Sequence, residues 1–498
     1  MKAIILAAGI GSRLQPITDT KPKTLVCVNG RPMIEWIIDS LLQSLVDDIV
    51  VCVGYKANDL IDHITKIYGK KANIKFVINS VYDSTNNMYS LYLARDYLYD
   101  DVLIMNADLV FDHTIIRDLI MIDGSAVAVD VGLYQEESMK VVIKNNSIAG
   151  ISKKIPQSDS YGCSIDIYKF DSIASDILHN EITRIIEVEN DLNQWTEVLL
   201  DRVFENGSVD ALAFDIGHRS WYEIDNFEDL AKAEILFNDK LKDLKLKKLF
   251  MIDKDGTLTL GDTPINGAES FLHMLNEKEK KWIIGSNNSS KTSCSHADTL
   301  DLLFPTVKNI SVVGSLDVAI KNLQNMGFNK VFWLANDLVS TELHRFFTYS
   351  EVNPDALLLT YDTEINYSKL LKFIAHVRNG IPYFSTHIDM VCPTIDGDIP
   401  DIGTFIHLIA TCVNKYPQDN FGKPSINFTK FLLDNSNISD YELVIIGDRL
   451  YTDIASCIGT NITSVLVLSG ETSRADYENS IYKADIVVPS VETLVDYL

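Results

Sequence analysis

Two short apolar runs that each end in a cluster of small and charged residues constrain the fold of this chain most strongly. The first run, residues 3–6, leads into a loop that reads Ala-Ala-Gly-Ile-Gly-Ser-Arg over residues 7–13. The second, residues 249–252, leads into Asp-Lys-Asp-Gly-Thr-Leu over residues 253–258. Short apolar runs bounded by glycine are typical of buried strands, and open α/β sheets bind ligands at the carboxyl ends of their strands. Each run therefore predicts the first strand of a separate ligand-binding domain.

Stretches with strand-like and helix-like apolar spacing alternate after both runs, which predicts mostly parallel sheets with helices on both faces. A charged, lysine-rich junction at residues 240–248 separates the two alternations, and the helix before it is expected to run from 227 to 244. At 498 residues the chain exceeds the size of one ordinary hydrophobic core. We therefore predict two Rossmann-like three-layer α/β domains, residues 1–240 and residues 246–498. The strands expected after the first are 48–53, 74–78, 102–105 and 126–129, and then 249–252, 282–284, 310–313, 331–334, 356–359, 444–446 and 465–468.

The composition argues against several classes of partner. The formal net charge of −25 argues against binding to nucleic acid or to an anionic membrane surface. No run approaches the roughly 18 apolar residues of a membrane span, and the glycine-rich loop interrupts the apolar start too early for a signal peptide. Seven dispersed cysteines without a Cys-x-x-Cys pair predict reduced thiols and a cytoplasmic location. Assembly into a homo-oligomer is compatible with the sequence.

The N-terminal loop has the composition of a nucleotide-binding site. Gly9 and Gly11 allow the backbone to approach an anion, and the two alanines before them leave room for a flat base. Arg13 and Lys23 can neutralise the charge of a triphosphate. An ordinary turn between strand and helix needs none of these charges.

Two carboxylates, Asp108 and Asp225, follow strand-like runs in the same half of the chain. Taken singly, either could be a turn residue or a helix cap. Because polar groups at the carboxyl ends of strands converge on the ligand, the two could jointly hold Mg²⁺ against a phosphate.

These motifs together resemble the sugar-phosphate and choline-phosphate nucleotidyltransferase superfamily over residues 1–236. The resemblance rests on the loop, on the segments 22–25, 29–33 and 221–225, and on the strand end at Asp108. It implies that Arg13 and Lys23 act on the phosphates of a nucleoside triphosphate, and that Asp108 and Asp225 bind Mg²⁺. The segment 86–91 is most similar to cytidylyltransferases that act on phosphocholine or aminoethylphosphonate, which implies CTP, with UTP and dTTP left open. The nucleotide-binding residues that it implies are Leu6, Ala7, Ala8, Gly9, Gly11, Ser12, Arg13, Lys23, Asn87, Ser90 and Asp108.

The implied reaction is an in-line attack by an acceptor phosphate on the α-phosphorus of the nucleotide, with loss of pyrophosphate. Lys140 and either Lys153 or Lys154 are candidates to hold the acceptor phosphate. Tyr134 and Tyr161 could line a binding pocket for a choline group, but aromatic residues more often belong to the hydrophobic core. Alditol phosphates and sugar phosphates therefore remain possible acceptors in addition to phosphocholine.

The central motif suits hydrolysis of a phosphate monoester. Asp253 is expected to attack phosphorus and form an aspartyl-phosphate, and Asp255 to protonate the leaving alcohol. Later segments add a hydroxyl and an amide at residues 286 and 287, a cation at residue 423 and acids suited to Mg²⁺ at residues 448 and 453. These residues are Ser286, Asn287, Lys423, Asp448 and Asp453.

Four motifs in this order resemble the haloacid dehalogenase (HAD) superfamily over residues 246–498. The resemblance implies that Asp253 is the nucleophile and that Asp253, Asp255, Asp448 and Asp453 form the Mg²⁺ site, while Ser286, Asn287 and Lys423 bind phosphate. The long interval before Lys423 predicts an inserted α/β cap at about 300–395, as in the subgroup of p-nitrophenylphosphatases and nucleotide phosphatases. His387 and Asp401 stand where that subgroup usually has Asn and Gly, which puts substrate recognition by the cap in doubt. By itself His387 is more often a packed residue than a catalyst.

The sequence thus predicts a bifunctional enzyme that needs Mg²⁺, a nucleoside triphosphate and small phosphorylated substrates. Such a fusion suits the synthesis of an activated alcohol or sugar headgroup for a surface polymer. Two alternatives stay open. In the first, only the nucleotidyltransferase is active and the HAD half binds a ligand or supports an oligomer. In the second, both halves are degenerate enzymes that act as a regulatory or scaffold protein. A scaffold has no need of such costly charged groups, so the presence of all the candidate residues argues against this alternative. These residues are Lys23, Asp108, Asp225, Asp253, Asp255, Lys423 and Asp448.

Overall fold

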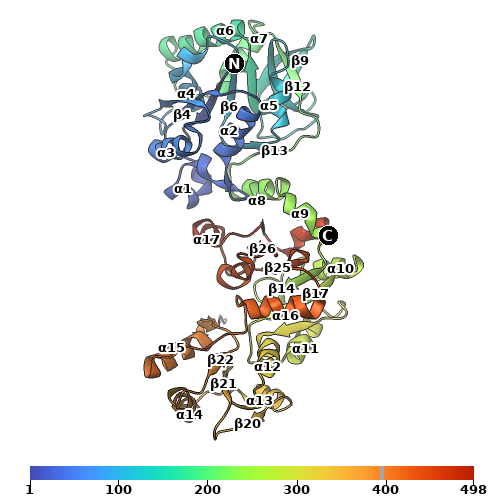
Figure 1. Ribbon diagram of the computed structural model, residues 1–498. Coiled ribbons are helices and arrows are strands. Elements are labelled where there is room, and N and C mark those ends of the chain that lie inside the picture. The colour runs from blue at the N-terminus through green and yellow to red at the C-terminus, as the bar shows by residue number, and fades with distance from the viewer. Residues whose placement is uncertain (393–396) are drawn as a thin grey trace. The chain divides into compact units, whose positions relative to one another are not determined.

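The computed structural model describes residues 1–392 and 397–498, and the chain divides into two compact units, Met1–Phe237 and Asn238–Leu498 (Figure 1). Both units are α/β structures, as predicted, but only the C-terminal unit has wholly parallel main sheets, because the large sheet of the N-terminal unit is mixed. We call them the N-terminal and the C-terminal unit and describe each by itself.

The N-terminal unit is built on a nine-stranded sheet with the order β10-β9-β11-β6-β1-β4-β5, to which β8 and β12 are added beside β11. Its strands β1, β4, β5 and β6 run parallel, whereas β11 pairs antiparallel with β6. The strands are β1 (Lys2–Ala7), β4 (Asp48–Val53), β5 (Asn73–Ile78), β6 (Val102–Asn106), β8 (Ser125–Val131), β9 (Lys140–Lys144), β10 (Ser147–Ser152), β11 (Gly162–Phe170) and β12 (Ala211–Asp215). A small second sheet pairs β7 (Leu109–Phe111) with β13 (Trp221–Glu223).

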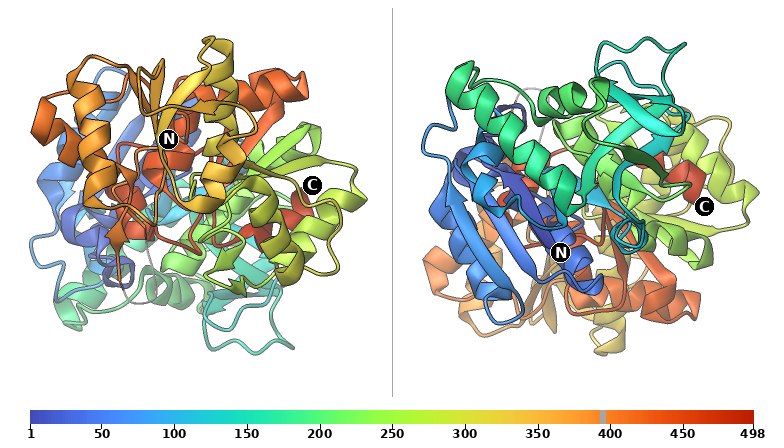
Figure 2. Two further views of the ribbon diagram at one scale, coloured as in Figure 1. Left: turned by 90° about the horizontal axis from the view of Figure 1, so that it is seen from below. Right: turned by 90° about the horizontal axis from the view of Figure 1, so that it is seen from above.

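Strand β1 is buried along its whole length because helices cover both faces of the sheet. Ala3 and Ile5 pack into one apolar cluster and Ile4 and Leu6 into the other, as the alternation of side chains along a strand requires. In the right-hand view of Figure 2 the green helices of residues 170–205 lie over the blue strands of this unit. The helices are α2 (Met33–Gln43), α3 (Ala57–Tyr68) and α5 (Thr114–Leu119) on one face, and α4 (Asn87–Leu93), α6 (Ser172–Thr183) and α7 (Thr196–Glu205) on the other.

The helix expected over residues 227–244 is interrupted. Helix α8 (Phe227–Leu236) ends before Asn238, whose side chain accepts a hydrogen bond from the backbone N–H of Lys240 and begins the short helix α9 (Asp239–Asp243). Helical apolar spacing continues through the break, so the capping asparagine was the only local signal for it.

The C-terminal unit contains a six-stranded parallel sheet with the order β18-β17-β14-β25-β26-β27. A separate four-stranded parallel sheet, β20-β19-β21-β22, lies within the range expected for the inserted cap. The strands are β14 (Leu249–Ile252), β17 (Lys281–Ser286), β18 (Val312–Gly314), β25 (Leu443–Gly447), β26 (Thr463–Val467) and β27 (Ile486–Val488), and then β19 (Lys330–Leu334), β20 (Thr348–Tyr349), β21 (Ala356–Leu359) and β22 (Tyr383–Ser385). The main helices are α10 (Ala268–Glu277), α11 (Ser293–Leu303), α12 (Ser315–Asn325), α13 (Asp337–Leu343), α14 (Tyr367–Arg378), α15 (Ile402–Val413), α16 (Ile426–Ser436) and α17 (Arg474–Asn479).

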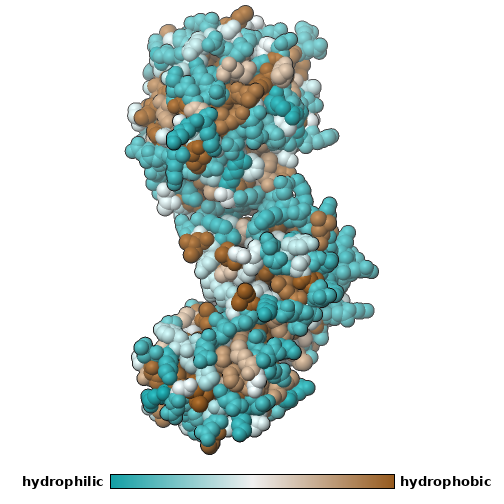
Figure 3. Space-filling model, viewed as in Figure 1, coloured by the Kyte–Doolittle hydropathy of each residue, from teal (hydrophilic) through white to brown (hydrophobic). Residues whose placement is uncertain are grey.

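The face of the molecule drawn in Figure 3 is mostly hydrophilic, with hydrophobic residues scattered over it. Among the described residues, no helix is both long enough and apolar enough to cross a bilayer.

Two candidate active sites

A cavity of about 400 Å³ opens at the carboxyl ends of the parallel strands of the N-terminal unit. Gly11 adopts a φ of 69°, and a Cβ at this position would lie 2.8 Å from Cβ of Lys23, so only glycine lets the lysine pass behind the loop. Every nucleotide-binding residue expected from the sequence lines this cavity, namely Leu6, Ala7, Ala8, Gly9, Gly11, Ser12, Arg13, Lys23, Asn87, Ser90 and Asp108.

Lys23 joins the two carboxylates that were expected to bind metal. Its Nζ donates to Oδ2 of Asp108 at 2.7 Å and to Oδ1 of Asp225 at 2.9 Å, and Arg13 pairs with the other oxygen of Asp225 at 2.9 Å. Burial alone would lower the pKa of Lys23, but the two carboxylates outweigh it and raise that pKa. The lysine is therefore a permanent cation beside the loop.

The chemistry of this acid group fits a divalent cation. Ligand oxygens of Asp108, Glu223 and Asp225 lie within 4.8 Å of one another. Oδ1 of Asp108 is buried without a hydrogen-bond partner in the described part of the chain, as expected of a carboxylate oxygen reserved for a metal. Glu223 was not among the metal ligands expected from the sequence. Glu223 lies two residues before Asp225, at the end of a strand. Side chains two residues apart on a strand point to the same side, so this spacing could have predicted Glu223 as a third ligand.

Further acids line the same cavity beyond the metal-type group. Asp166 lies on β11 at a φ of 58°, in a strand whose register shifts between Ser164 and Tyr168. The hydroxyl of Tyr168 lies 2.9 Å from both Asp166 and Glu197. Burial, and then the charge of Glu197, raises the pKa of Asp166 to about 8, while burial and then the charge of Asp108 raises that of Glu223 to about 9. Sequence reasoning missed this group because its members come from separate elements.

The two lysines expected to bind the acceptor lie in different surroundings. Lys140 is fully buried, does not line the cavity, and donates from Nζ to the backbone carbonyls of Glu136 and Lys153. Lys153 does line the cavity, with its Nζ 4.9 Å from the ring centroid of Trp195. Lys140 therefore supports the segment that carries Lys153 rather than facing a ligand. The described residues that line the cavity do not include Tyr134, Lys154 or Tyr161.

A second cavity, of about 470 Å³, lies at the carboxyl ends of the strands of the C-terminal unit. Gly256 adopts a φ of 84°, and a Cβ there would come within 2.2 Å of Oδ2 of Asp448, so glycine is required where the turn meets that acid. The cavity is lined by the predicted residues Asp253, Asp255, Ser286, Asn287, Lys423 and Asp448.

Lys423 occupies the centre of this second site. Its Nζ contacts Oδ1 of Asp253, donates to Oδ1 of Asp453 at 2.7 Å and to the carbonyl of Gly285 at 3.1 Å. Burial raises the pKa of Asp253 to about 6 even though Lys423 opposes the shift. The ammonium is thereby fixed next to the carboxylate expected to be the nucleophile.

Asp253, Asp448 and Asp453 offer oxygens within 4.8 Å of one another, and Oδ1 of Asp448 is buried without a hydrogen-bond partner among the described residues. This group also fits a divalent cation. Asp255 is not a member of it, because its half-exposed carboxylate pairs with Nζ of Lys254 at 2.7 Å on the rim of the cavity. The metal role expected for Asp255 therefore has no support in the side-chain geometry.

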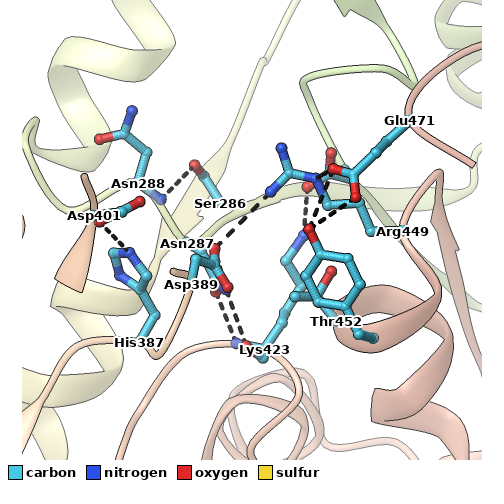
Figure 4. Close-up of polar contacts among 12 residues, drawn as sticks. Ser286, Asn287, Asn288, His387, Asp389, Asp401, Lys423, Arg449, Thr452 and Glu471 are labelled. Carbon is cyan, nitrogen blue, oxygen red and sulfur yellow. Dashed lines mark hydrogen bonds and ion pairs between the residues drawn. The ribbon is translucent and has the colours of Figure 1, made fainter. Parts of the chain in front are cut away.

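Residues that follow β22 and the residue that begins α15 contribute a buried histidine and two acids beside the second cavity (Figure 4). Nε2 of His387 lies 3.0 Å from Oδ1 of Asp401, which also accepts the backbone N–H of Ile402 and begins α15. Asp389 accepts from Nδ2 of Asn287 at 3.2 Å and lies 4.0 Å from the guanidinium of Arg449. The two departures from the subgroup pattern, His387 and Asp401, are thus partners in one ion pair.

This pair predicts a pH-dependent stability. Burial lowers the pKa of His387, but the hydrogen bond to Asp401 and the charge of Asp389 outweigh it, so the pKa in the folded state lies above the ordinary value. The stabilisation is fully present below the unfolded pKa of about 6.5 and is lost as pH rises through the folded value. His387→Gln should therefore narrow the difference in thermal stability between pH 6 and pH 9. The exposed His407→Gln should leave that difference unchanged, and an equal effect of both substitutions would contradict the role of the pair.

Both sites combine a buried lysine, a group of carboxylates and a glycine turn at strand ends, an arrangement suited to binding a phosphate group together with a divalent cation. Residues 2–235 match the family model for nucleotidyl transferase, residues 250–346 the model for haloacid dehalogenase-like hydrolase, and residues 420–494 the model for HAD-hydrolase-like proteins. The chain thus consists of a nucleotidyltransferase domain followed by a HAD-family hydrolase domain, which confirms the resemblance seen in the sequence.

Individual relatives match one half of the chain each. The choline-phosphate cytidylyltransferase of Streptococcus pneumoniae is 40% identical over 119 residues, 24% of this chain and 50% of that protein. The bifunctional protein GlmU of Methanococcus maripaludis is 28% identical over 44% of this chain and 52% of its own length. The chain therefore spans about half the length of these first curated relatives.

The C-terminal half matches phosphatases. The acid sugar phosphatase of Staphylococcus aureus is 27% identical over 239 residues, 47% of this chain and 92% of that protein. Among solved structures, the 4-nitrophenylphosphatase of Thermotoga maritima is 30% identical, with 51% of this chain and 98% of that chain covered at a TM-score of 0.49.

Proposed function

We propose that this chain is a bifunctional enzyme. Its N-terminal domain transfers CMP from CTP to a small phosphorylated acceptor and releases pyrophosphate, and its C-terminal domain hydrolyses a small phosphomonoester. The observation that carries the proposal is that each cavity holds a buried lysine between carboxylates, beside an acid oxygen that has no hydrogen-bond partner among the described residues. Such groups are costly unless a cation and a phosphate engage them.

In the N-terminal site, the backbone of the glycine loop would hold the triphosphate, with Arg13 and Lys23 compensating its charge. Asp108, Glu223 and Asp225 would hold Mg²⁺, which supplies further charge compensation at the phosphorus that is attacked. Lys153, on the cavity wall, would hold the acceptor phosphate in line. These groups align the reactants and neutralise charge, and none of them forms a covalent bond with the substrate.

The acceptor is proposed to carry a positive charge. The strand order β11-β6-β1-β4-β5 places Asp166, on β11, at the opposite end of the cavity from the strands that follow the nucleotide loop. Asp166 and Glu197 line that region, and in the described part of the chain neither of the two forms an ion pair. An ammonium group on the acceptor would compensate them, whereas neutral hydroxyls would not.

Glu197→Gln tests this reading of the acceptor. The substitution keeps the shape and the acceptor oxygen but removes one charge, so the KM for a phosphorylated amino alcohol should rise about 10-fold or more. The KM for CTP should not change, because Glu197 lies on the acceptor side. An unchanged acceptor KM would count against a cationic acceptor.

In the C-terminal site, Asp253 would attack phosphorus while Ser286 and Lys423 hold the phosphoryl oxygens, and Asp255 would protonate the leaving alkoxide. Asp253 and Asp448 would hold Mg²⁺, which compensates the charge of the phosphoryl group, and Asp453 would keep Lys423 in place. We further propose the sheet of β19 to β22 with α14 and α15 as the cap that selects the substrate.

The overall test is a substrate matrix with the full chain and Mg²⁺. Pyrophosphate release is followed with CTP, UTP or dTTP against phosphoethanolamine, phosphocholine, glycerol phosphate and a sugar phosphate, and phosphate release is followed with each monoester alone. CTP with an aminated acceptor should be the most active pair. Absence of pyrophosphate from every combination would refute the transferase assignment.

A further inference from the structure

The wall of the N-terminal cavity beyond β4 and β5 carries a group of hydrogen-bonding side chains. Asn79 directly follows β5, is only 2% exposed, and lines the cavity together with Thr85 and Ser90. The end of β4 is packed closely on this wall, because a Cβ at Gly54 would lie 2.7 Å from the carbonyl of Ala8 and 2.8 Å from Cβ of Tyr82. The wall therefore adjoins the nucleotide loop and lies at the opposite end of the sheet from Asp166.

The orientation of the Asn79 amide follows from one contact. Its Oδ1 accepts the backbone N–H of Val81 at 3.1 Å, and a backbone N–H can only donate. Nδ2 must therefore point the other way, where it donates to Oγ1 of Thr85 and to Oγ of Ser90, both at 3.1 Å. A flipped amide would place two donors against each other at Val81.

The hydroxyls of Thr85 and Ser90 differ in whether their protons are already donated within the protein. Oγ1 of Thr85 donates its proton to the carbonyl of Val81 at 2.8 Å, so this hydroxyl is committed. Ser90 is 2% exposed, and its Oγ accepts from Asn79, yet no described residue takes its proton. Because Ser90 lines the cavity and no other described residue accepts this proton, the hydroxyl can donate it to a ligand in the cavity.

We propose that Asn79 is a positioning residue that makes Ser90 a hydrogen-bond donor toward the nucleobase and thereby selects cytosine over uracil. This inference rests on the proposed nucleotidyl transfer. The Watson–Crick edge of cytosine presents two adjacent acceptors, O2 and N3, whereas uracil carries a hydrogen on N3. A fixed donor facing N3 is satisfied by cytosine and meets another donor in uracil.

Asn79→Asp in the full chain tests the proposal directly. Aspartate has almost the same shape and can still accept from Val81, but when ionised it accepts from Ser90 as well. The serine proton then turns toward residue 79 and its lone pairs face the cavity, which favours the N3–H of uracil. Titration calorimetry with CTP and with UTP in Mg²⁺, without an acceptor, should show the ratio of the two affinities shifted toward UTP by roughly 10-fold to 100-fold.

Two companion variants separate this role from a structural one. Ser90→Ala removes the donor and should weaken CTP binding without improving UTP binding. Asn206→Asp adds the same charge at an exposed position of the same unit and should leave both affinities unchanged. Melting temperatures of all variants identify any general loss of fold, which would weaken both nucleotides equally.

Each outcome bears on a separate statement. Wild-type protein that binds neither nucleotide would remove the proposed transferase function itself. Wild-type protein that prefers UTP, or an Asn79→Asp variant with an unchanged ratio, would overturn the role of Asn79 while nucleotidyl transfer stands. A variant ratio that moves toward UTP supports it.

Discussion

Asp253→Asn should abolish phosphate release by the full chain, with a loss of at least about 1,000-fold in kcat. The amide has nearly the same shape but is a poor nucleophile toward phosphorus, so the aspartyl-phosphate cannot form. Lys423 keeps its contacts with Asp453 and with the carbonyl of Gly285, which should preserve the fold of the site. Release of 4-nitrophenol from 4-nitrophenyl phosphate in Mg²⁺ measures the effect.

The exposed Asp434→Asn on α16 is the matched control, because it makes the same chemical change on the same domain at a residue that is not among those described as lining the cavity. Both variants should retain full pyrophosphate release, since Asp253 and Asp434 belong to the C-terminal unit. Phosphatase activity that survives Asp253→Asn would exclude Asp253 as the nucleophile. A wild-type protein without phosphatase activity would favour the alternative in which the HAD domain only binds a ligand or supports an oligomer.

Lys23→Met should reduce pyrophosphate release by roughly 100-fold to 10,000-fold. The substitution removes the cation that lies 2.7 Å from Asp108 and 2.9 Å from Asp225. Without it the carboxylates repel one another and the phosphates of the nucleotide lose their buried partner. A coupled assay for pyrophosphate, with CTP and the best acceptor from the substrate matrix, measures the loss.

Lys66→Met, on the exposed face of α3, is the matched control for loss of a lysine. Because Lys23→Met also leaves buried acids without a partner, Lys23→Arg provides a second variant that keeps the charge but changes its geometry. It should fold as stably as the wild type and still lose most of the activity. Full activity of either variant at position 23 would contradict the catalytic role, and the phosphatase activity should be unchanged in both.

Much of the candidate chemistry could be predicted because it lies in short segments. Glycine, lysine and aspartate at the ends of strand-like runs marked the loop after β1 and the turn after β14, and the predicted nucleotide-binding residues do line one cavity. Local sequence patterns were less informative about residues whose surroundings depend on a helix, strand or loop from elsewhere in the chain. Lys140 and Lys153 were equivalent as surface lysines in the sequence, but Lys140 is enclosed by two backbone carbonyls.

The acidic residues of the N-terminal cavity that were not predicted also depend on contacts between distant parts of the chain. Glu197 begins a helix and Asp166 interrupts a strand, and 30 residues of chain separate them. Asp166 and Tyr168 already meet within β11, and only the packing of α7 against the sheet brings Glu197 to them. The partnership of His387 with Asp401 has the same origin, because it joins a residue that follows β22 to the residue that caps α15.

By itself, the sequence determined the α/β class, the two enzyme families and the charged residues at the ends of the strands, since each depends on apolar periodicity and on neighbours within a few positions. The tertiary structure alone decided which side chains share a cavity, which lysine is enclosed, and which way the amide of Asn79 points. The physical reason is that charge compensation and hydrogen-bond polarity depend on groups brought within about 3 Å by folding, whatever their separation along the chain.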